Sequence, residues 1–515
     1  MSLTIHFKSR DFKPVLLAGI KASPLRLSWS AFGGPDRADL RLEGAAGNLF
    51  RLANLLRCPV EISDPYASPA WWGFVDRIVI HIGGVQVSLS LLELFNKVRV
   101  CYSFISPDNH LAEVKMTDFV GDAASQAEYG IREKVLHRVD LDDVHAESLR
   151  DTFLAGHAWP ESQLSHAIGG ETDAAHRSFV ELHCSGWFKT LAWMHYQNQE
   201  GFFANYGPGP GSFEFANAST RRNPGQLIRP NEDSNLAYAY FMLRKVGSHA
   251  RNFQCRVFDA GTGTAIAYSD THTADELDED SWSWVRFQFD PPFPMAGGSN
   301  YYVCVRCTDG TNAYNYFSMR IDESQHLKGS KAVYYNGSSF VNMPSTVIGF
   351  GVPDCYFRVL CSKDTGAQLA EVAAAGGQFI ERITSLSTGI RTSPYCFEPE
   401  TCLQRIEGLM MAGTSQQRLV LARVSPQRHL DFYEQPSNQT PTALMDLQGR
   451  FYSLEGKPLA PYQPPVGQYV YLSGTDQLTF PWDRHRFPAC FVHKAAYHFH
   501  SGAVQIKPFS IDSIV

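Results

Sequence analysis

The chain has 515 residues, of which 44% are hydrophobic, 13% aromatic and 19% charged. This composition excludes a disordered chain, and its aromatic content favours a β-rich protein with roughly three or four folding units. The formal net charge is −7, and the nearest approach to a basic cluster is Arg221-Arg222, which argues against a general nucleic-acid binder.

The amino terminus lacks the basic start and apolar core of a secretory signal, and no run reaches the roughly 18 apolar residues of a membrane span. We therefore expect a soluble protein that is made in a cytoplasm, without membrane insertion. The eleven cysteines are an odd number, and most lie in apolar, strand-like contexts such as Cys255, Cys304 and Cys355. Buried free thiols are therefore favoured over a disulfide framework.

Residues 1–105 are predicted to form strands with little helix. Residues 39–43 and 59–63 alternate between apolar and polar side chains, which is typical of a half-buried strand. Between them, 48–57 has its leucines at helical spacing. We expect a small β-barrel or curled sheet that carries one short helix.

The same segment contains a predicted hairpin. Residues 71–82 form a long strand, Gly83-Gly84 turns the chain, and 85–91 returns. Trp71 and Trp72 lie on opposite sides of the first strand because side chains alternate along it. One is expected to fill the barrel core while the other faces outward.

Residues 106–196 mix helix and strand. Asp142-Asp143 is a predicted cap for a helix that ends near residue 157. After it, 179–184 and 186–193 both have the apolar character of strands.

Residues 197–358 differ sharply in composition from the rest. Residues 205–212 are rich in glycine and proline and predict a linker or exposed loop. Short strands then follow one another with glycine-containing turns and without helical spacing, at 235–245, 252–259, 282–290, 301–306 and 331–335. This pattern predicts a β-sandwich of the jelly-roll type.

Residues 359–515 return to mixed character. Helices are predicted at 364–375 and 400–411, because both have helix-forming residues and end at glycine. Strands are expected at 418–424 and 430–433. The fold class is therefore mainly β, with some α+β character.

Several short motifs follow one another in a fixed order. They are CPVEI at 58–62, WWGFV at 71–75, YGIRE at 129–133 and SLRDTFL at 148–154 with Pro160, then a stretch from Asp364 through 378–380 to Gly413-Thr414 and Arg428. In this order they resemble phage tail hub proteins, the group of contractile-phage baseplate hubs and VgrG-like spike bases. The resemblance covers about two thirds of the chain.

The resemblance implies a homotrimeric, ring-like hub of β-barrel domains around the tail axis. Its parts would be 1–105, 106–196 and 359–515, with 197–358 as an inserted sandwich. Such a protein is a structural component of the virion tail and not an enzyme. Its partners would be its own copies, tail-tube and distal tail proteins, and a spike or fibre, with DNA only passing through the lumen.

Two other functions stay open: a carbohydrate-binding protein and a tail-associated cell-wall hydrolase. The segment 309–317 favours sugar recognition, because Tyr314 and Tyr316 alternate beside Asn312 and Asn315. Aromatic faces suit the apolar side of a pyranose, and amides suit its hydroxyls. The alternative is a hairpin whose tyrosines pack on the sandwich.

Two pairs of tryptophans each have a structural and a functional interpretation. Trp282 and Trp284 share one strand face, and core packing is favoured over ligand stacking. The outward member of Trp71 and Trp72 is a candidate subunit contact, or else it is covered by the helix at 142–157.

Metal ligands are not expected. His485, His493, His498 and His500 lack a third ligand at a recognised spacing. The acidic run Asp275, Glu276, Asp278, Glu279 and Asp280 lacks the glycine and spacing of an EF-hand and predicts a solvated loop. Structural calcium in the inserted domain is the remaining alternative, and no other cofactor is expected.

Overall fold

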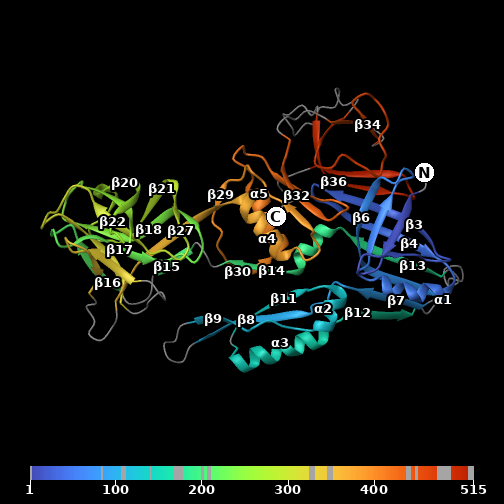
Figure 1. Ribbon diagram of the computed structural model, residues 1–515, viewed down its shortest axis with the longest axis horizontal. Coiled ribbons are helices and arrows are strands. Elements are labelled where there is room, and N and C mark those ends of the chain that lie inside the picture. The colour runs from blue at the N-terminus through green and yellow to red at the C-terminus, as the bar shows by residue number, and fades with distance from the viewer. Residues whose placement is uncertain are drawn as a thin grey trace. The chain divides into compact units, whose positions relative to one another are not determined.

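The computed structural model describes residues 3–82, 85–105, 112–139, 141–166, 178–198, 202–205, 210–323, 331–344, 352–436, 442–446, 450–472 and 489–508. The chain divides into two compact units (Figure 1). Unit 1 contains residues 1–196, 366–390 and 399–515, and unit 2 contains 197–365 and 391–398. Strands predominate in both, which confirms a mainly β fold, but the described strands form several sheets and no closed barrel, so the β-barrel considered for residues 1–105 is not formed there.

The largest sheet of unit 1 is built around a strand that comes late in the sequence. Strand β13 (Phe179–Ser185) lies between β4 (Phe32–Glu43) and β6 (Pro69–Ile82) and is antiparallel to both. Leu182 stands opposite Leu40 on one side and Ile78 on the other, and all three are fully buried.

Other strands extend this sheet in both directions. Beyond β4 lie β3 (Lys21–Ser30), β36 (Ala489–His498) and β37 (Ala503–Pro508). The two halves of β6 pair with β5 (Pro59–Ser63) and with β7 (Val85–Ser90), the predicted hairpin partner. Next to these lie β1 (Thr4–Lys8), β2 (Pro14–Val15) and β12 (Glu161–His166). The turn at Gly83-Gly84 lies outside the described residues.

The leucine-spaced segment of the first part of the chain is helical, as predicted. It forms α1 (Ala46–Leu49) and the 3-10 helix η1 (Phe50–Leu55). Leu49, Leu52 and Leu55 are buried, so the face that was recognised from spacing is the one that packs.

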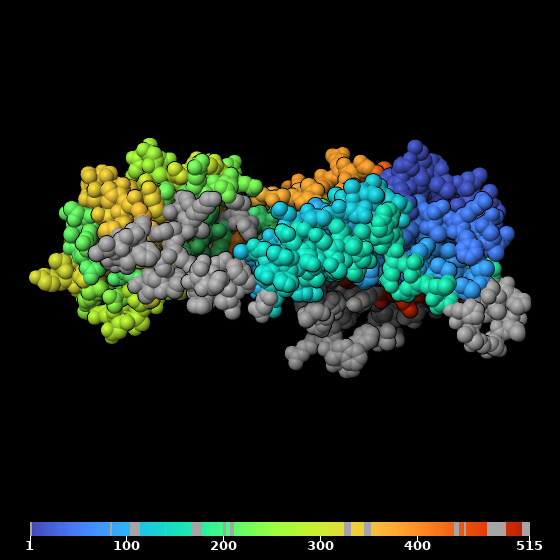
Figure 2. Space-filling model, turned by 90° about the horizontal axis from the view of Figure 1, so that it is seen from below, coloured from blue at the N-terminus to red at the C-terminus, as the bar shows by residue number. Residues whose placement is uncertain are grey.

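A smaller sheet with two helices forms another part of unit 1. It consists of β8 (Lys97–Ile105), β9 (Ala112–Met116), β10 (Val120–Gly121) and β11 (Glu133–Val139), with α2 (Ala123–Tyr129) and α3 (Asp143–His157). Helix α3 confirms the predicted helix, and the Asp142 carboxylate accepts a hydrogen bond from the His145 N–H at 2.8 Å. In Figure 2, the residues of this region form one continuous cyan surface.

The segment 186–193 is not a strand, and that prediction was wrong. It forms the 3-10 helix η2 (Trp187–Trp193), in which Trp187, Phe188, Leu191 and Trp193 are all buried. A run in which nearly every side chain is apolar has no detectable period, and tertiary packing decides its conformation. The Trp187 ring packs 5.2 Å from that of Phe74, centroid to centroid.

The carboxy-terminal part of unit 1 contains both predicted helices, α4 (Thr365–Gly376) and α5 (Cys402–Ala412). Its strands are β28 (Arg382–Thr384), β31 (Val420–Val424), β32 (His429–Glu434), β33 (Ala443–Met445), β34 (Phe451–Ser453) and β35 (Tyr469–Leu472). Strand β31 joins β4 through the parallel pair Ala422 and Phe32. Both ends of the chain therefore contribute to one sheet system.

Unit 2 consists mainly of two antiparallel sheets that share one core. The eight-stranded sheet contains β15 (Phe202–Asn205), β16 (Pro210–Phe215), β18 (Ser234–Val246), β21 (Ser283–Met295), β23 (Tyr316–Asp322), β26 (Asp354–Cys355), β27 (Phe357–Asp364) and β29 (Arg391–Thr392). The six-stranded sheet contains β17 (Arg222–Ile228), β19 (Asn252–Asp259), β20 (Ala265–Thr273), β22 (Tyr301–Cys307), β24 (Lys331–Tyr335) and β25 (Phe340–Asn342).

Phenylalanines fill the space between these two sheets. Phe241 and Phe287 come from the eight-stranded sheet, Phe253 comes from the six-stranded sheet, and all three are fully buried. The Phe253 and Phe287 rings lie 5.9 Å apart. The expected free thiols are confirmed where the chain is described, since each cysteine characterised there is buried and outside any disulfide.

Candidate functional site

The outer face of the eight-stranded sheet in unit 2 carries an unusual set of side chains. Along β18, Ala239, Phe241 and Leu243 are buried in the core, so the alternate side chains face outward. The same alternation along β21, β23 and β27 brings arginines and aromatic rings together. We call this set the arginine–aromatic face; it comprises Arg244, Arg286, Arg320, Arg358, Tyr238, Tyr240, Tyr316, Tyr356, Trp282 and Trp284.

Each of the four arginines lies over an aromatic ring of the face. The guanidinium carbons of Arg244 and Arg320 lie 4.9 and 5.7 Å from the centre of the Trp282 ring. The Arg358 carbon lies 5.0 Å from the Trp284 ring, and the Arg286 carbon 5.6 Å from the ring of Tyr238. These are cation–π distances, so the rings hold the guanidinium groups in place.

The strand register sets the spacing of two of these arginines. Tyr240 in β18 stands opposite Arg286 in β21 and opposite Arg358 in β27. The two arginines are therefore two strand spacings apart, about 10 Å. This separation is that of the two backbones, since the Arg358 guanidinium reaches across to the Trp284 ring in β21.

Three arginines of the face have no carboxylate partner. Within the described part of unit 2, no ion pair joins Arg244, Arg286 or Arg320 to an acidic side chain. The Nε atoms of Arg244 and Arg320 are also buried without a hydrogen-bond partner there. A buried donor without a partner costs free energy.

Tyr316 connects this face with the segment that was predicted to bind glycans. Its hydroxyl donates to Glu214 Oε1 at 3.2 Å. Burial raises the pKa of this hydroxyl, the Glu214 charge raises it further, and the charge of Arg244 opposes them. The influence of both charges places Tyr316 beside Arg244 on the face.

The other three residues predicted for glycan binding lie in the loop before β23. Tyr314 is 84% exposed and projects into solvent. The Asn312 Oδ1 atom accepts hydrogen bonds from the N–H groups of Tyr314 at 2.9 Å and Asn315 at 3.1 Å, so it stabilises the turn. The Asn315 carbonyl accepts from Arg251 at 2.5 Å. A glycan-binding role for these four residues stays a prediction.

Trp282 and Trp284 do not pack in the core, contrary to the favoured interpretation. Trp284 is 36% exposed, and Trp282 is intermediate in exposure. Alternation showed that the two share a face, but it could not show which face is buried. The arginines beside them in space were missed because they are far apart in the sequence.

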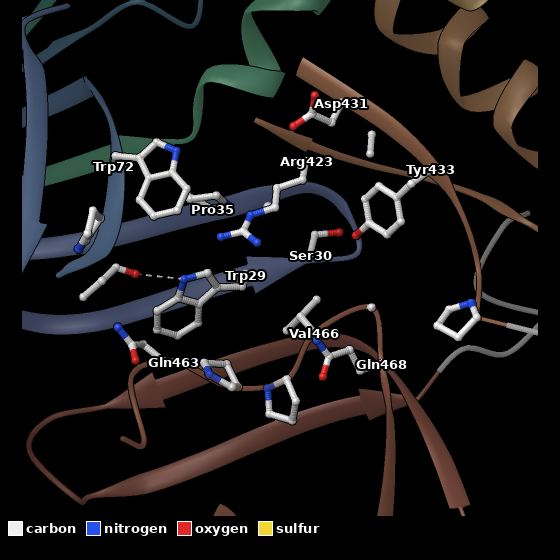
Figure 3. A pocket seen from close by; sticks show the side chains of 18 residues that line it. Trp29, Ser30, Pro35, Trp72, Arg423, Asp431, Tyr433, Gln463, Val466 and Gln468 are labelled. Carbon is white, nitrogen blue, oxygen red and sulfur yellow. Dashed lines mark hydrogen bonds between the residues drawn. The ribbon is translucent and has the colours of Figure 1, made fainter. Parts of the chain in front are cut away.

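Unit 1 contains a pocket of about 690 Å³, which Figure 3 shows from close by. Trp29 and Trp72 form part of its wall, and Arg423, Asp431 and Tyr433 come from β31 and β32. The wall is completed by Ser30, Gly34, Pro35, Pro69, Ala70, Ala422, Pro436, Gln463, Pro464, Pro465, Val466, Gly467 and Gln468.

The two tryptophans of the pocket are fixed by their own hydrogen bonds. Trp29 Nε1 donates to the Ala70 carbonyl at 3.2 Å, and Trp72 Nε1 donates to the Val424 carbonyl at 2.9 Å. They therefore offer apolar surface rather than donors. Burial raises the pKa of the Tyr433 hydroxyl, and the Arg423 charge opposes it.

The pocket wall combines aromatic rings with polar side chains. The described wall has one hydroxyl-bearing serine, Ser30, whose oxygen accepts from the Phe32 N–H at 3.1 Å. No histidine or cysteine belongs to that described wall, so it provides no serine–histidine or cysteine–histidine pair.

Trp71 and Trp72 are both buried inside the chain. Their exposed fractions are 0% and 5%. The expected outward tryptophan is therefore absent from this strand: β6 is covered on both faces, and the carbonyl of Val424, not the helix at 142–157, contacts the Trp72 indole. A role for either residue in subunit contact stays a prediction.

The histidines and acidic residues considered as metal ligands are separated in the described chain, where no group of three potential ligands occurs. His493 is 6% exposed and packs edge-on to Phe32, while His500 is exposed. His485 lies outside the described residues. In the acidic run, Glu276 caps a short 3-10 helix and contacts His272 Nδ1 at 2.6 Å.

The remaining acidic side chains of that run lie at the surface. Asp275, Glu279 and Asp280 are exposed or nearly so, and Asp278 accepts hydrogen bonds from the Asp280 N–H and the Ser281 hydroxyl, both at 3.0 Å. This agrees with a solvated loop, and calcium binding there stays an untested alternative. No helix in the described ranges is long and apolar enough to span a membrane.

Comparisons with known proteins give little. No family model and no curated protein matches the chain. A solved carbohydrate-binding module of the β-sandwich superfamily aligns at 7% identity and a TM-score of 0.14, covering 59% of this chain and 97% of the module. The mosquito-larvicidal Cry4Aa toxin from Bacillus thuringiensis aligns at 7% identity and a TM-score of 0.14, covering 58% and 51%.

A structure of infectious bursal disease virus, Gx strain, aligns at 7% identity with a TM-score of 0.16. It covers 70% of this chain and 75% of the viral chain. TM-scores this low give no basis for assigning a fold or a function, so the residues themselves must support any proposal.

Proposed function

We propose that the chain is a structural phage-tail protein of the hub type, and that unit 2 binds host-surface glycans without turning them over. The hub assignment is supported by the order of the motifs from CPVEI to Arg428 and by the contribution of both chain ends to one sheet system. The proposed hub is a homotrimer or ring that joins the tail tube to a spike or fibre.

The adhesive role is supported chiefly by the arginine–aromatic face. Unit 2 has two sheets on one core, as a jelly-roll sandwich does, and its eight-stranded sheet displays polar donors beside partly exposed rings. A glycan needs both, because each pyranose has apolar C–H surface and hydroxyl groups. Tyr316 belongs to this site, and Tyr314 lies in the adjoining loop.

The size of the Trp284 contact can be worked out from its exposure. The exposed 36% of a side chain of about 250 Å² is about 90 Å². Burying this area under a sugar stabilises binding by about 2 kcal/mol, or about 30-fold in affinity. Trp284→Ala should therefore weaken binding by about this factor.

A glycan array with the full-length chain tests the proposal. We expect specific binding, reduced about 30-fold by Trp284→Ala. Tyr268→Ala is the matched control, because Tyr268 is 55% exposed on the six-stranded sheet, and it should bind normally. A blank array, or normal binding by Trp284→Ala, would exclude glycan binding by this face.

The hub assignment has a separate test. Light scattering of the purified chain, alone and with tail partners, should give the mass of a trimer or hexamer. A stable monomer under both conditions would count against the hub. A zymogram on host envelopes should show no clearing, and clearing would favour the tail-associated hydrolase instead.

A further inference from the structure

The arginines of the same face narrow the class of glycan. We infer that the arginine–aromatic face binds anionic polysaccharides, whose sugars carry carboxylate or sulfate groups. This inference rests on the proposed function, since it concerns the same site. It goes beyond that function because a face for neutral sugars needs no cluster of cations.

Charge complementarity is the first argument. Arg244, Arg286 and Arg320 lack a carboxylate partner within the described part of unit 2. A guanidinium group presents parallel N–H donors that match the two oxygens of a carboxylate or two oxygens of a sulfate. Neutral hydroxyl groups would leave the three positive charges uncompensated.

The fixed position of two guanidinium groups is the second argument. Arg244 and Arg320 are both held over the Trp282 ring, with their Nε atoms buried. The ring holds each guanidinium in place, and only the terminal N–H groups are left to contact a ligand, because the Nε atoms are buried. The arginines are therefore positioned as donors before any ligand arrives, which lowers the entropic cost of binding.

The strand register is the third argument, and it favours a polymer over a single sugar. Tyr240 in β18 has Arg286 in β21 on one side and Arg358 in β27 on the other, so the arginines of the face come from several neighbouring strands. A single acidic sugar carries one anionic group, whereas a chain that bears repeated anionic groups can engage several of these arginines. Simultaneous engagement raises the affinity of the polymer over that of its monomer.

A nucleic acid would also bring anionic groups, but the rings argue against it. Single strands bind by stacking their bases on aromatic faces. The Trp282 ring already has two guanidiniums over it, so a base cannot stack on it in the same place. The formal net charge of −7 also provides no general attraction for a nucleic acid.

The test uses the full-length chain and two matched pairs of polymers. Polygalacturonate is compared with its carboxyl-reduced form, and dextran sulfate with dextran, by affinity electrophoresis and biolayer interferometry. We expect binding to at least one anionic member and at least tenfold weaker binding to its neutral counterpart. The two pairs separate carboxylate from sulfate recognition. Galacturonic acid monomer should compete poorly.

Arginine variants locate the binding surface. Arg286→Gln and Arg320→Gln should each weaken binding to the anionic polymer by about tenfold. Arg256→Gln is the control, because Arg256 lies 5.0 Å over the Tyr268 ring on the six-stranded sheet and has the same local chemistry. It should bind normally. Thermal melting must match the wild type, and for a variant that unfolds, Lys replaces Gln.

The other possible results of these binding experiments each support or overturn the inference of an anionic polysaccharide. Equal binding of neutral and anionic polymers, unchanged by Arg286→Gln, overturns the anionic class but leaves the proposed glycan binding intact. Failure to bind any polymer here or on the array overturns both. Equal losses from Arg256→Gln would mean unspecific charge attraction. Oligothymidine binding as tight as that of the best polysaccharide would replace the glycan with a nucleic acid.

Discussion

Lowering the pH should destabilise unit 1 through one buried histidine. His195 begins β14 (His195–Asn198), and its side chain is 13% exposed. Burial lowers the pKa of this imidazole to about 4, and the charges of Arg99, Lys134 and His137 act in the same direction. Glu133 opposes them, but its carboxylate oxygen lies 3.9 Å from His195 Nδ1.

The sign and size of the stability change follow from the difference in the His195 pKa between the folded and unfolded chains. The pKa of His195 is about 4 in the folded chain and has its ordinary value of 6.5 in the unfolded chain, so the unfolded chain binds the proton first as pH falls. Stability is therefore full above about pH 6.5 and is lost toward pH 4. The whole shift corresponds to about 3 kcal/mol, of which about 2 kcal/mol is lost by about pH 5.

Urea unfolding at about pH 7.5 and about pH 5, followed by tryptophan fluorescence, measures this loss. The wild type should lose about 2 kcal/mol more than His195→Gln, which cannot gain the proton. His500→Gln, at an exposed position, should behave like the wild type. Equal losses in the wild type and His195→Gln would refute the assignment of acid sensitivity to this residue.

Three substitutions test the packing described above. Phe241→Ala removes a fully buried ring from unit 2 and should cost about 3–5 kcal/mol, visible as an early unfolding transition in urea. Asp142→Ala removes the N-cap of α3 and should cost about 1 kcal/mol by the same measurement. In Gly73→Ala the new Cβ would lie 2.1 Å from the Ser185 carbonyl oxygen, so the melting temperature should drop sharply, whereas Gly47→Ala meets nothing within 4 Å and should be neutral. Normal melting of Gly73→Ala would contradict the close contact of β6 and β13.

Local sequence signals predicted those elements whose cause is local. The helix after Asp142 was found because its capping residue and its spacing agree, and η1 because its leucines repeat at helical spacing. Strand alternation similarly paired Trp282 with Trp284 on one face. In each case the physical cause lies within a few residues of the element.

Features that depend on distant residues were not predictable in this way. The alternation of side chains along a strand predicts that Trp71 and Trp72 point in opposite directions. It does not predict that both of these side chains are buried. The arginine–aromatic face is assembled from strands that begin at Ser234, Ser283 and Phe357, and no local pattern aligns them. Only the sheet register reveals that Arg286 and Arg358 both stand opposite Tyr240 of β18.

The position of β13 has a consequence for how the protein is made. Strands β4 and β6 leave the ribosome long before residues 179–185, so each has an unpaired edge until β13 arrives between them. Strand β3 waits still longer, for β36 at 489–498. Unit 2 is complete by residue 398 and can fold before β36 is made. A nascent chain that stalls after unit 2 but before β36 would present the unpaired edge of β3 to neighbouring chains and aggregate.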